Sequence, residues 1–147
     1  MGNPLLCDDG VGLYIAAELK NRLHRKDITI MESGSAGLNL LDPLVGFDRA
    51  IIIDAIQTAE GKAGQIYRLD PQAFDTARHT ASPHNVSFTT ALEFGRRLGL
   101  PLPREIIIFA IEAQDVTTFS EECTPPVKQA IPTCIQMILQ ELNTPAT

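Results

Sequence analysis

The chain has 147 residues, of which 44% are hydrophobic and 20% charged, and its formal net charge is −6 at neutral pH. These values are typical of one globular domain over residues 1–147 and exclude a disordered chain. The acidic balance argues against a nucleic-acid partner, and the absence of a long apolar run argues against a membrane partner. Three cysteines without metal-type spacing predict reduced thiols in a cytoplasmic protein.

The first predicted element is a helix over about residues 9–26. Its apolar side chains recur at helical spacing, at Val11, Ile15, Leu19 and Leu23. Two adjacent carboxylates, Asp8 and Asp9, stand at its start. One acid is enough to cap a helix, so the second suggests a metal ion or a catalytic role. The alternative is that Asp8 caps the helix while Asp9 complements the helix dipole in the first turn.

Two β-branched stretches follow this helix. Residues 27–32 predict a short strand that ends at Glu32, and residues 48–54 predict a buried strand that ends at Asp54. Between them, the small residues 33–37 predict a turn, which leads into a short helical piece.

The second half of the chain continues the alternation of strands and helices. Residues 65–69 alternate polar and apolar side chains, which predicts an edge strand with one wet face. Residues 70–83 show no periodicity and predict a long loop. The remaining predicted elements are a helix capped by Asn85 or Ser87, a buried strand over residues 105–112 and a helix that starts at Thr124 and is kinked at Pro132.

This alternation predicts a three-layer α/β/α sandwich with a mostly parallel sheet and one antiparallel edge strand. Ligands of such sheets bind beyond the carboxyl ends of the strands. Asp54 ends a strand, and Asp9 and His84 each precede a helix that packs back along the sheet, so we expect the three to meet at this edge. Two carboxylates and an imidazole suit a divalent transition metal such as nickel, zinc or cobalt.

Each candidate also has a purely structural interpretation. Asp54 can cap a turn, and His84 can pack at the start of its helix. Glu32 and Glu112 can order neighbouring loops, and Cys7 can be a small buried hydrophobe rather than a soft ligand. The joint position of the three candidates therefore supports a site more strongly than any one residue does.

A series of short, spaced motifs runs through nearly the whole chain. They occupy residues 2–6 (GNPLL), 8–12 (DDGVG), 34–41, 54–55, 64–69, 82–84 and 111–112. In this order and spacing they resemble the nickel–iron hydrogenase maturation endopeptidases. The resemblance implies an aspartic-type endopeptidase that removes the C-terminal extension of a hydrogenase large-subunit precursor after nickel has been inserted there.

The resemblance also implies roles for individual residues. Asp9, Asp54 and His84 match the family's metal ligands, which recognise nickel carried by the precursor, and other divalent metals can substitute for it. Either carboxylate can then assist the attack of water on the scissile bond. Asp8 remains a capping or orienting residue. The turn matched to the substrate groove consists of Gly34, Ser35, Ala36 and Gly37.

The sequence departs from the family at its start. Members of the family begin with an apolar strand before the Gly-Asn-Pro motif, whereas Met1 stands directly before Gly2 here. We therefore expect this first strand to be absent and the protein to be a monomer, with self-association possible because of the missing strand. Two alternative functions remain open: a non-catalytic α/β domain that binds a divalent metal, and a protease of similar fold that acts on another peptide.

Overall fold

The computed structural model describes residues 1–34, 37–78 and 86–145. Its centre is a sheet in the strand order β1 (Arg49–Ile56), β3 (Glu105–Glu112) and β2 (Ile66–Leu69). β1 is parallel to β3, and the register pairs the first residues and the last residues of the two strands. β2 lies antiparallel on the other edge of β3. The predicted antiparallel edge strand is therefore confirmed.

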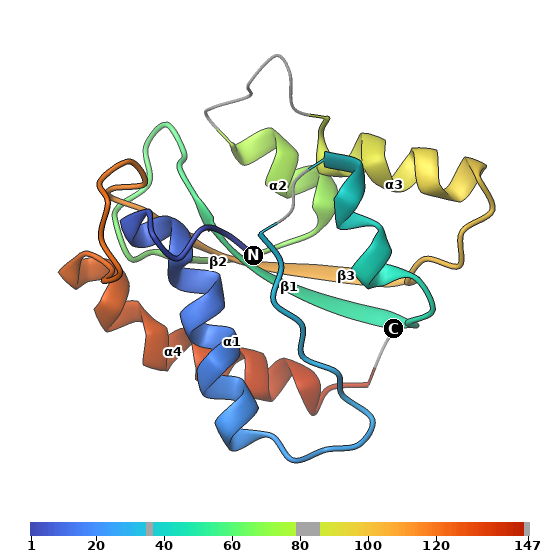
Figure 1. The fold of residues 1–147 in the computed structure, drawn as a ribbon, viewed down its shortest axis with the longest axis horizontal. Helices are drawn as coiled ribbons and strands as arrows, with labels where there is room; N and C mark the ends of the chain where they lie inside the picture. The colour runs from blue at the N-terminus through green and yellow to red at the C-terminus, as the bar shows by residue number, and fades with distance from the viewer. Residues whose placement is uncertain (35–36, 79–85, 146–147) are drawn as a thin grey trace.

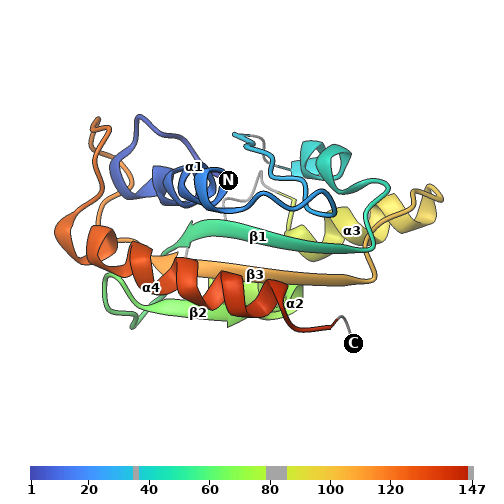
Figure 2. The same ribbon diagram turned by 90° about the horizontal axis from the view of Figure 1, so that it is seen from below.

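Helices cover both faces of the sheet, as Figures 1 and 2 show. α1 (Val11–Arg22) and α4 (Pro125–Leu142) pack on one face, and α2 (Pro71–Ala77) and α3 (Phe88–Arg97) on the other. Successive side chains of a strand point to opposite faces, so β3 feeds both cores. Ile107, Phe109 and Ile111 pack in the core with α1 and α4. Ile106, Ile108 and Ala110 pack in the core with α2 and α3. The three-layer sandwich is thus confirmed.

Short 3-10 helices precede α1 and β1. η1 (Cys7–Gly10) leads into α1, and η2 (Gly37–Leu40) and η3 (Asp42–Leu44) replace the short helical piece predicted before β1. α1 ends at Arg22, four residues earlier than predicted, because Leu23 takes an extended conformation. In the described ranges, no helix is both long enough and apolar enough to cross a membrane.

The strand predicted over residues 27–32 is wrong. This segment runs extended or in a turn, and it pairs with none of the strands found among the described residues. A β-branched pattern reports an extended conformation but says nothing of a partner, and across from this segment lies a groove rather than a strand.

The long loop predicted over residues 70–83 is also wrong in part, because α2 occupies its first half. Asp70 caps this helix by accepting a hydrogen bond from the amide of Ala73 at 2.7 Å. Pro71 follows at the first helical position, where its missing N–H costs nothing. A helix of seven residues is too short to show a periodicity, but the Asp-Pro pair is a start signal that the sequence does contain.

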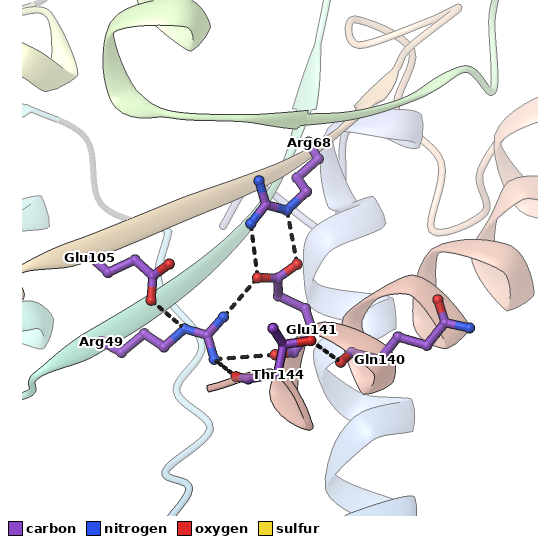
Figure 3. Close-up of polar contacts among 6 residues, drawn as sticks. All are labelled: Arg49, Arg68, Glu105, Gln140, Glu141 and Thr144. Carbon is purple, nitrogen blue, oxygen red and sulfur yellow. Dashed lines mark hydrogen bonds and ion pairs between the residues drawn. The ribbon is translucent and has the colours of Figure 1, made fainter. Parts of the chain in front are cut away.

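A cluster of charged side chains ties the end of α4 to the sheet (Figure 3). Arg49 of β1 pairs with Glu105 of β3 at 2.8 Å and with Glu141 of α4 at 2.7 Å. Arg68 of β2 pairs with the second oxygen of Glu141 at 2.8 Å. Arg49 also donates to the carbonyl oxygen of Thr144, just beyond the helix. The last turn of α4 is therefore joined directly to β1 and β2, and through Arg49 to β3.

Candidate functional site

Two of the three predicted ligands meet near the carboxyl end of β1. Asp54 is the sixth residue of this strand, which continues to Ile56, and its carboxylate accepts the amide of Ala55 at 2.9 Å. Asp9 lies in η1 and accepts the amide of Asn3 at 2.9 Å. The two carboxylates are close enough for the charge of Asp9 to raise the pKa of Asp54.

The environment of Asp54 favours its protonated form. Burial raises the pKa of this carboxyl from 3.8 to about 6, although the ammonium group of Met1 and the Ala55 amide oppose the shift. The same burial lowers the pKa of the Met1 ammonium, against the attraction of Asp54 and Asp9. A carboxylate with a pKa near neutrality is suited to exchange protons at physiological pH.

Asp8 does not face this site. It is completely buried, and one of its carboxylate oxygens accepts the amides of Gln114 and Asp115 at 2.9 and 3.0 Å. The other oxygen accepts the amide of Thr124, the N-cap residue of α4, at 2.7 Å. Asp8 thus joins η1 to the loop after β3 and to the start of α4. This arrangement fits the orienting role expected of it, and it caps α4 rather than α1.

Glycine is required where the first residues touch Asp9. A Cβ on Gly2 would lie 1.8 Å from the carbonyl oxygen of Asp9, and the φ angle of Gly2 is +130°. A Cβ on Gly34 would lie 3.7 Å from the carbonyl oxygen of Gly2. The start of the turn predicted to bind substrate therefore lies beside the Asp9 segment. Gly37 opens η2, while Ser35 and Ala36 lie outside the described residues.

His84 also lies outside the described residues, but both of its flanks are described. Asp75 of α2 accepts the amides of Phe88 and Thr89, in the first turn of α3, at 3.0 and 2.8 Å. Ser87, one of the two predicted caps of α3, accepts the amide of Thr90. In the described ranges, no group of three His, Cys, Asp or Glu side chains lies close enough to hold a metal.

Two other acids that the sequence placed at strand ends take structural roles. Glu32 lies on the extended segment rather than on a strand and pairs with Lys20 at 2.8 Å on the surface. Glu112 is buried at the end of β3 and accepts the amide and the hydroxyl of Thr58 at 3.0 and 2.7 Å. A Cβ on Gly61 would lie 2.0 Å from Glu112. Glu112 therefore orders the loop after β1, as its structural interpretation predicted.

Sequence reasoning missed the Met1 amino group and Asp75 as contributors to this edge, and it did not identify the partners of Asp8. The Met1 amino group carries no pattern that would place it beside Asp54. The contacts of Asp75 and Asp8 both join residues distant in sequence, so no local signal identifies either partner. Cys7 is a buried residue with a φ angle of +50°, which agrees with a packing role.

Comparison with known proteins gives a consistent result. The family model described as hydrogenase maturation protease (HycI) matches residues 13–141. The hydrogenase expression/formation protein HupD of Bradyrhizobium diazoefficiens is 28% identical over 144 residues, which cover 97% of this chain and 74% of HupD. The hydrogenase 2 maturation protease of Escherichia coli is 26% identical, covering 97% of this chain and 87% of that protein.

Solved structures agree with these matches. The hydrogenase-maturating endopeptidase HybD of Escherichia coli superimposes with a TM-score of 0.81 at 27% identity, over 97% of this chain and 88% of that one. The maturation protease HycI of Thermococcus kodakarensis shares the fold, with a TM-score of 0.72 at 20% identity over 97% of this chain and 88% of its own. The chain belongs to the hydrogenase maturation protease family.

Proposed function

We propose that this peptidase removes the C-terminal extension of a nickel–iron hydrogenase large-subunit precursor, and that it does so only after nickel has been inserted there. Membership of the family makes the chain a hydrolase of peptide bonds that acts in hydrogenase maturation. The observation that carries the finer proposal is the pair of carboxylates, Asp9 and Asp54, gathered at one edge of the sheet with the pKa of Asp54 raised to about 6.

In the proposed reaction, Asp54 or Asp9 acts as the general base for a water molecule. The carboxylate takes one proton from the water while the water oxygen adds to the scissile carbonyl carbon. The carbon–nitrogen bond then breaks, and the same carboxyl returns the proton to the leaving amine. The raised pKa of Asp54 suits both steps, because a group that titrates near pH 6 can accept and release a proton at neutral pH.

Nickel enters this scheme as part of the substrate, held jointly by the precursor and by Asp9, Asp54 and His84. The chemistry of the donors fits, since carboxylate oxygen and imidazole nitrogen both bind divalent transition metals. Asp9 uses Oδ2 to bind the Asn3 amide and Asp54 uses Oδ1 to bind the Ala55 amide. No hydrogen-bond donor among the described residues reaches the other oxygen of either carboxylate, so each keeps one for a ligand. The ion would position the precursor and polarise the scissile carbonyl.

Incubation of the purified protein with nickel-loaded and nickel-free precursor tests this function. We expect only the nickel-loaded precursor to yield the shortened large subunit and the released peptide. Mass spectrometry detects both products. Equal cleavage of both precursors would contradict the recognition of nickel, and cleavage of neither would contradict the choice of substrate.

A matched control separates the site from a general loss of charge. Asp48 is an exposed acid at the opposite end of the strand that carries Asp54. We expect Asp48→Asn to process the precursor at the normal rate while Asp54→Asn does not. A similar loss in both variants would show that the position of Asp54 is not what matters.

We also propose that this reaction takes place in the cytoplasm. Cys7, Cys123 and Cys134 are all free thiols in the described structure, which suits a reducing compartment. Fractionation of cells that express the protein under its own promoter would test this, with periplasmic recovery as the contrary result.

A further inference from the structure

Two large apolar side chains, Leu5 and Phe119, lie exposed beside the segment that carries Asp9. Phe119 is 85% exposed and Leu5 is 50% exposed. Leu5 stands shortly before η1, and Phe119 belongs to the loop between β3 and α4. Figures 1 and 2 both show this loop, in orange, beside the dark-blue first residues. Apolar side chains scattered singly over a surface need no explanation, but these two occupy neighbouring positions.

A parallel β-bridge between Leu6 and Ser120 makes the two side chains neighbours. The amide of Ser120 donates to the carbonyl oxygen of Leu5 at 3.0 Å, and the amide of Cys7 donates to the carbonyl oxygen of Ser120 at 2.9 Å. Leu5 and Phe119 each come directly before a bridged residue. Successive side chains of extended segments alternate between faces, so both lie on the face opposite the bridged side chains. Their exposure agrees, since the two bridged residues are half-buried.

Hydrogen bonds hold both segments of this surface in place. The hydroxyl of Tyr14, on α1, lies within hydrogen-bond distance of the carbonyl oxygens of Pro4 and Glu121, so it links the two segments. Within the loop, the carboxylate of Asp115 accepts the amide of Thr118 at 2.9 Å. A surface that is already ordered loses little conformational entropy when a ligand binds to it.

The same surface is joined to Asp9 through Asn3. The amide of Asn3 donates to Oδ2 of Asp9 at 2.9 Å, and the side-chain oxygen of Asn3 accepts the amide of Leu5 at 3.0 Å. The amide of Asp9 donates to the carbonyl oxygen of Leu6 at 3.0 Å. An extended peptide advances about 3.3 Å per residue. A peptide with its scissile bond at Asp9 therefore has the exposed pair within reach of residues a few positions away.

We propose that Leu5 and Phe119 form a docking surface for an apolar segment of the precursor close to the bond that is cleaved. This inference rests on the proposed function, because the precursor is the occupant that it names. Covering the two side chains removes apolar area from water, which favours the complex before the reaction begins as much as during it. The pair therefore contributes to affinity and to the choice of precursor, whereas the carboxylates act on the bond.

The charges beside the pair favour this occupant over a membrane and over a second copy of the chain. Glu121 and Glu122 follow Phe119 closely in the same loop; both are exposed, and neither forms an ion pair within the described part of the chain. Their charges repel anionic lipid headgroups. In a symmetric dimer the same acids would face their own copies. A precursor segment with apolar side chains and no acidic ones meets neither repulsion.

The test compares steady-state processing of nickel-loaded precursor by the parent chain and by Phe119→Ala. We expect KM to rise at least about tenfold and kcat to stay within about twofold, because the lost contact serves binding rather than the reaction. Phe119→Leu, which keeps an apolar side chain, should restore most of the affinity. The Tm of both variants should equal that of the parent, since the side chain of Phe119 is exposed.

Leu98→Ala is the matched control. Leu98 is 61% exposed and stands at the end of α3, on the side of the sheet where β3 begins. We expect this variant to keep the parent KM. A rise in KM like that of Phe119→Ala would overturn the proposal, because a general loss of apolar surface would then explain both. A lower Tm in Phe119→Ala would overturn it too, by showing that the side chain supports the fold.

The remaining outcomes separate this proposal from the proposed function. Normal KM in Phe119→Ala, with cleavage by the parent chain, would overturn the docking surface alone. No cleavage by the parent chain would contradict the proposed function, and the docking surface with it. A dimer of the parent chain in light scattering that is lost in Phe119→Ala would assign the surface to a second copy. Binding of the parent chain, but not of Phe119→Ala, to phosphatidylglycerol vesicles would assign it to a membrane. Either assignment would overturn the proposal.

Discussion

At the scale of the residue, Asp54 is held in an environment that serves reactivity rather than stability. Burial raises its pKa to about 6, so at pH 7 the folded protein holds an ionised carboxylate in a poorly solvated position. Neighbouring Met1 and Ala55 compensate for only part of this cost. Replacing the acid by its neutral isostere should therefore separate the two effects.

We predict that Asp54→Asn lowers the rate of precursor processing by at least about a hundredfold and stabilises the folded chain at pH 7. The asparagine cannot act as a base, but it keeps the shape and removes the buried charge. The gain in unfolding free energy should be up to about 3 kcal/mol. Urea denaturation at pH 7 measures it, and a variant less stable than the parent chain would contradict this account.

The sign of the pH dependence follows from the direction of the shift. Asp54 binds its proton more tightly in the folded state than in the unfolded state, where the pKa is near 3.8. Its contribution to stability is therefore greatest below the unfolded pKa and is lost as the pH rises through about 6. We predict that the difference in stability between Asp54→Asn and the parent chain grows over this range. A constant difference from pH 4 to pH 7 would argue against the raised pKa.

The predicted ligand His84 gives a different pH profile. An imidazole must be neutral to bind a metal, so nickel affinity should fall as the pH approaches about 6.5 from above. We expect calorimetric titrations with nickel to show this fall in the parent chain. In His84→Ala we expect weaker binding at pH 8 and abolished processing. Nickel affinity independent of pH between 6 and 8 would exclude His84 as a ligand.

At the scale of the element, buried acids join segments that are distant in sequence. Asp8 connects η1 with the loop after β3 and with α4. We predict that Asp8→Ala lowers the unfolding free energy by about 3 kcal/mol, because three buried amides lose their acceptor. Thermal and urea denaturation measure this loss. Asp115→Ala, at an exposed carboxylate that binds only within its own loop, is the control and should cost far less.

The charged cluster at the end of α4 makes a second link of this kind. Arg68 and Arg49 lower the pKa of Glu141, whose side chain is only 12% exposed. This contribution to stability is present above the unfolded pKa and is lost as the pH falls through the folded pKa. We predict that Glu141→Gln destabilises the chain by about 1–2 kcal/mol at pH 7. Glu18→Gln, in an exposed pair with Arg22, should have little effect; equal effects would contradict the prediction.

Elements with a strong local signal could be predicted from sequence alone. The two continuously apolar strands, β1 and β3, lie where the pattern placed them, and the alternating segment is the edge strand β2. The segment over residues 27–32 has the same β-branched composition but pairs with no strand in the described part of the chain. The helix α2 is short enough that its cap, rather than a periodicity, is its only signal. Strand pairing thus depends on contacts that no window of sequence contains, whereas a short helix has to be recognised from its cap.

The candidate site, too, could be predicted from the sequence only in part. The rule that ligands of such a sheet bind beyond the carboxyl ends of its strands, applied to Asp54 at a strand end and Asp9 before a helix, correctly places these two acids close together. That rule does not extend to Glu32 and Glu112, whose side chains turn to Lys20 and Thr58. Which of several edge acids remains free for a ligand depends on the donors that surround it, and the sequence does not reveal those donors.

At the scale of the whole molecule, β3 holds two apolar cores together. One core lies between the sheet and α1 and α4, and the other between the sheet and α2 and α3. The groove beside β1 opens into both. A change in the groove should therefore alter the stability of the two halves together rather than that of one half alone.

The buried thiols, Cys7 and Cys134, allow local opening of the fold to be measured in the unmodified protein. Cys134 lies on the buried face of α4 and Cys7 is buried in η1, and burial raises the pKa of Cys134 to about 12. An alkylating reagent at neutral pH therefore finds almost no thiolate there until the surrounding segment opens. The rates at which Cys7 and Cys134 are labelled therefore measure how often their own regions open, without an introduced probe.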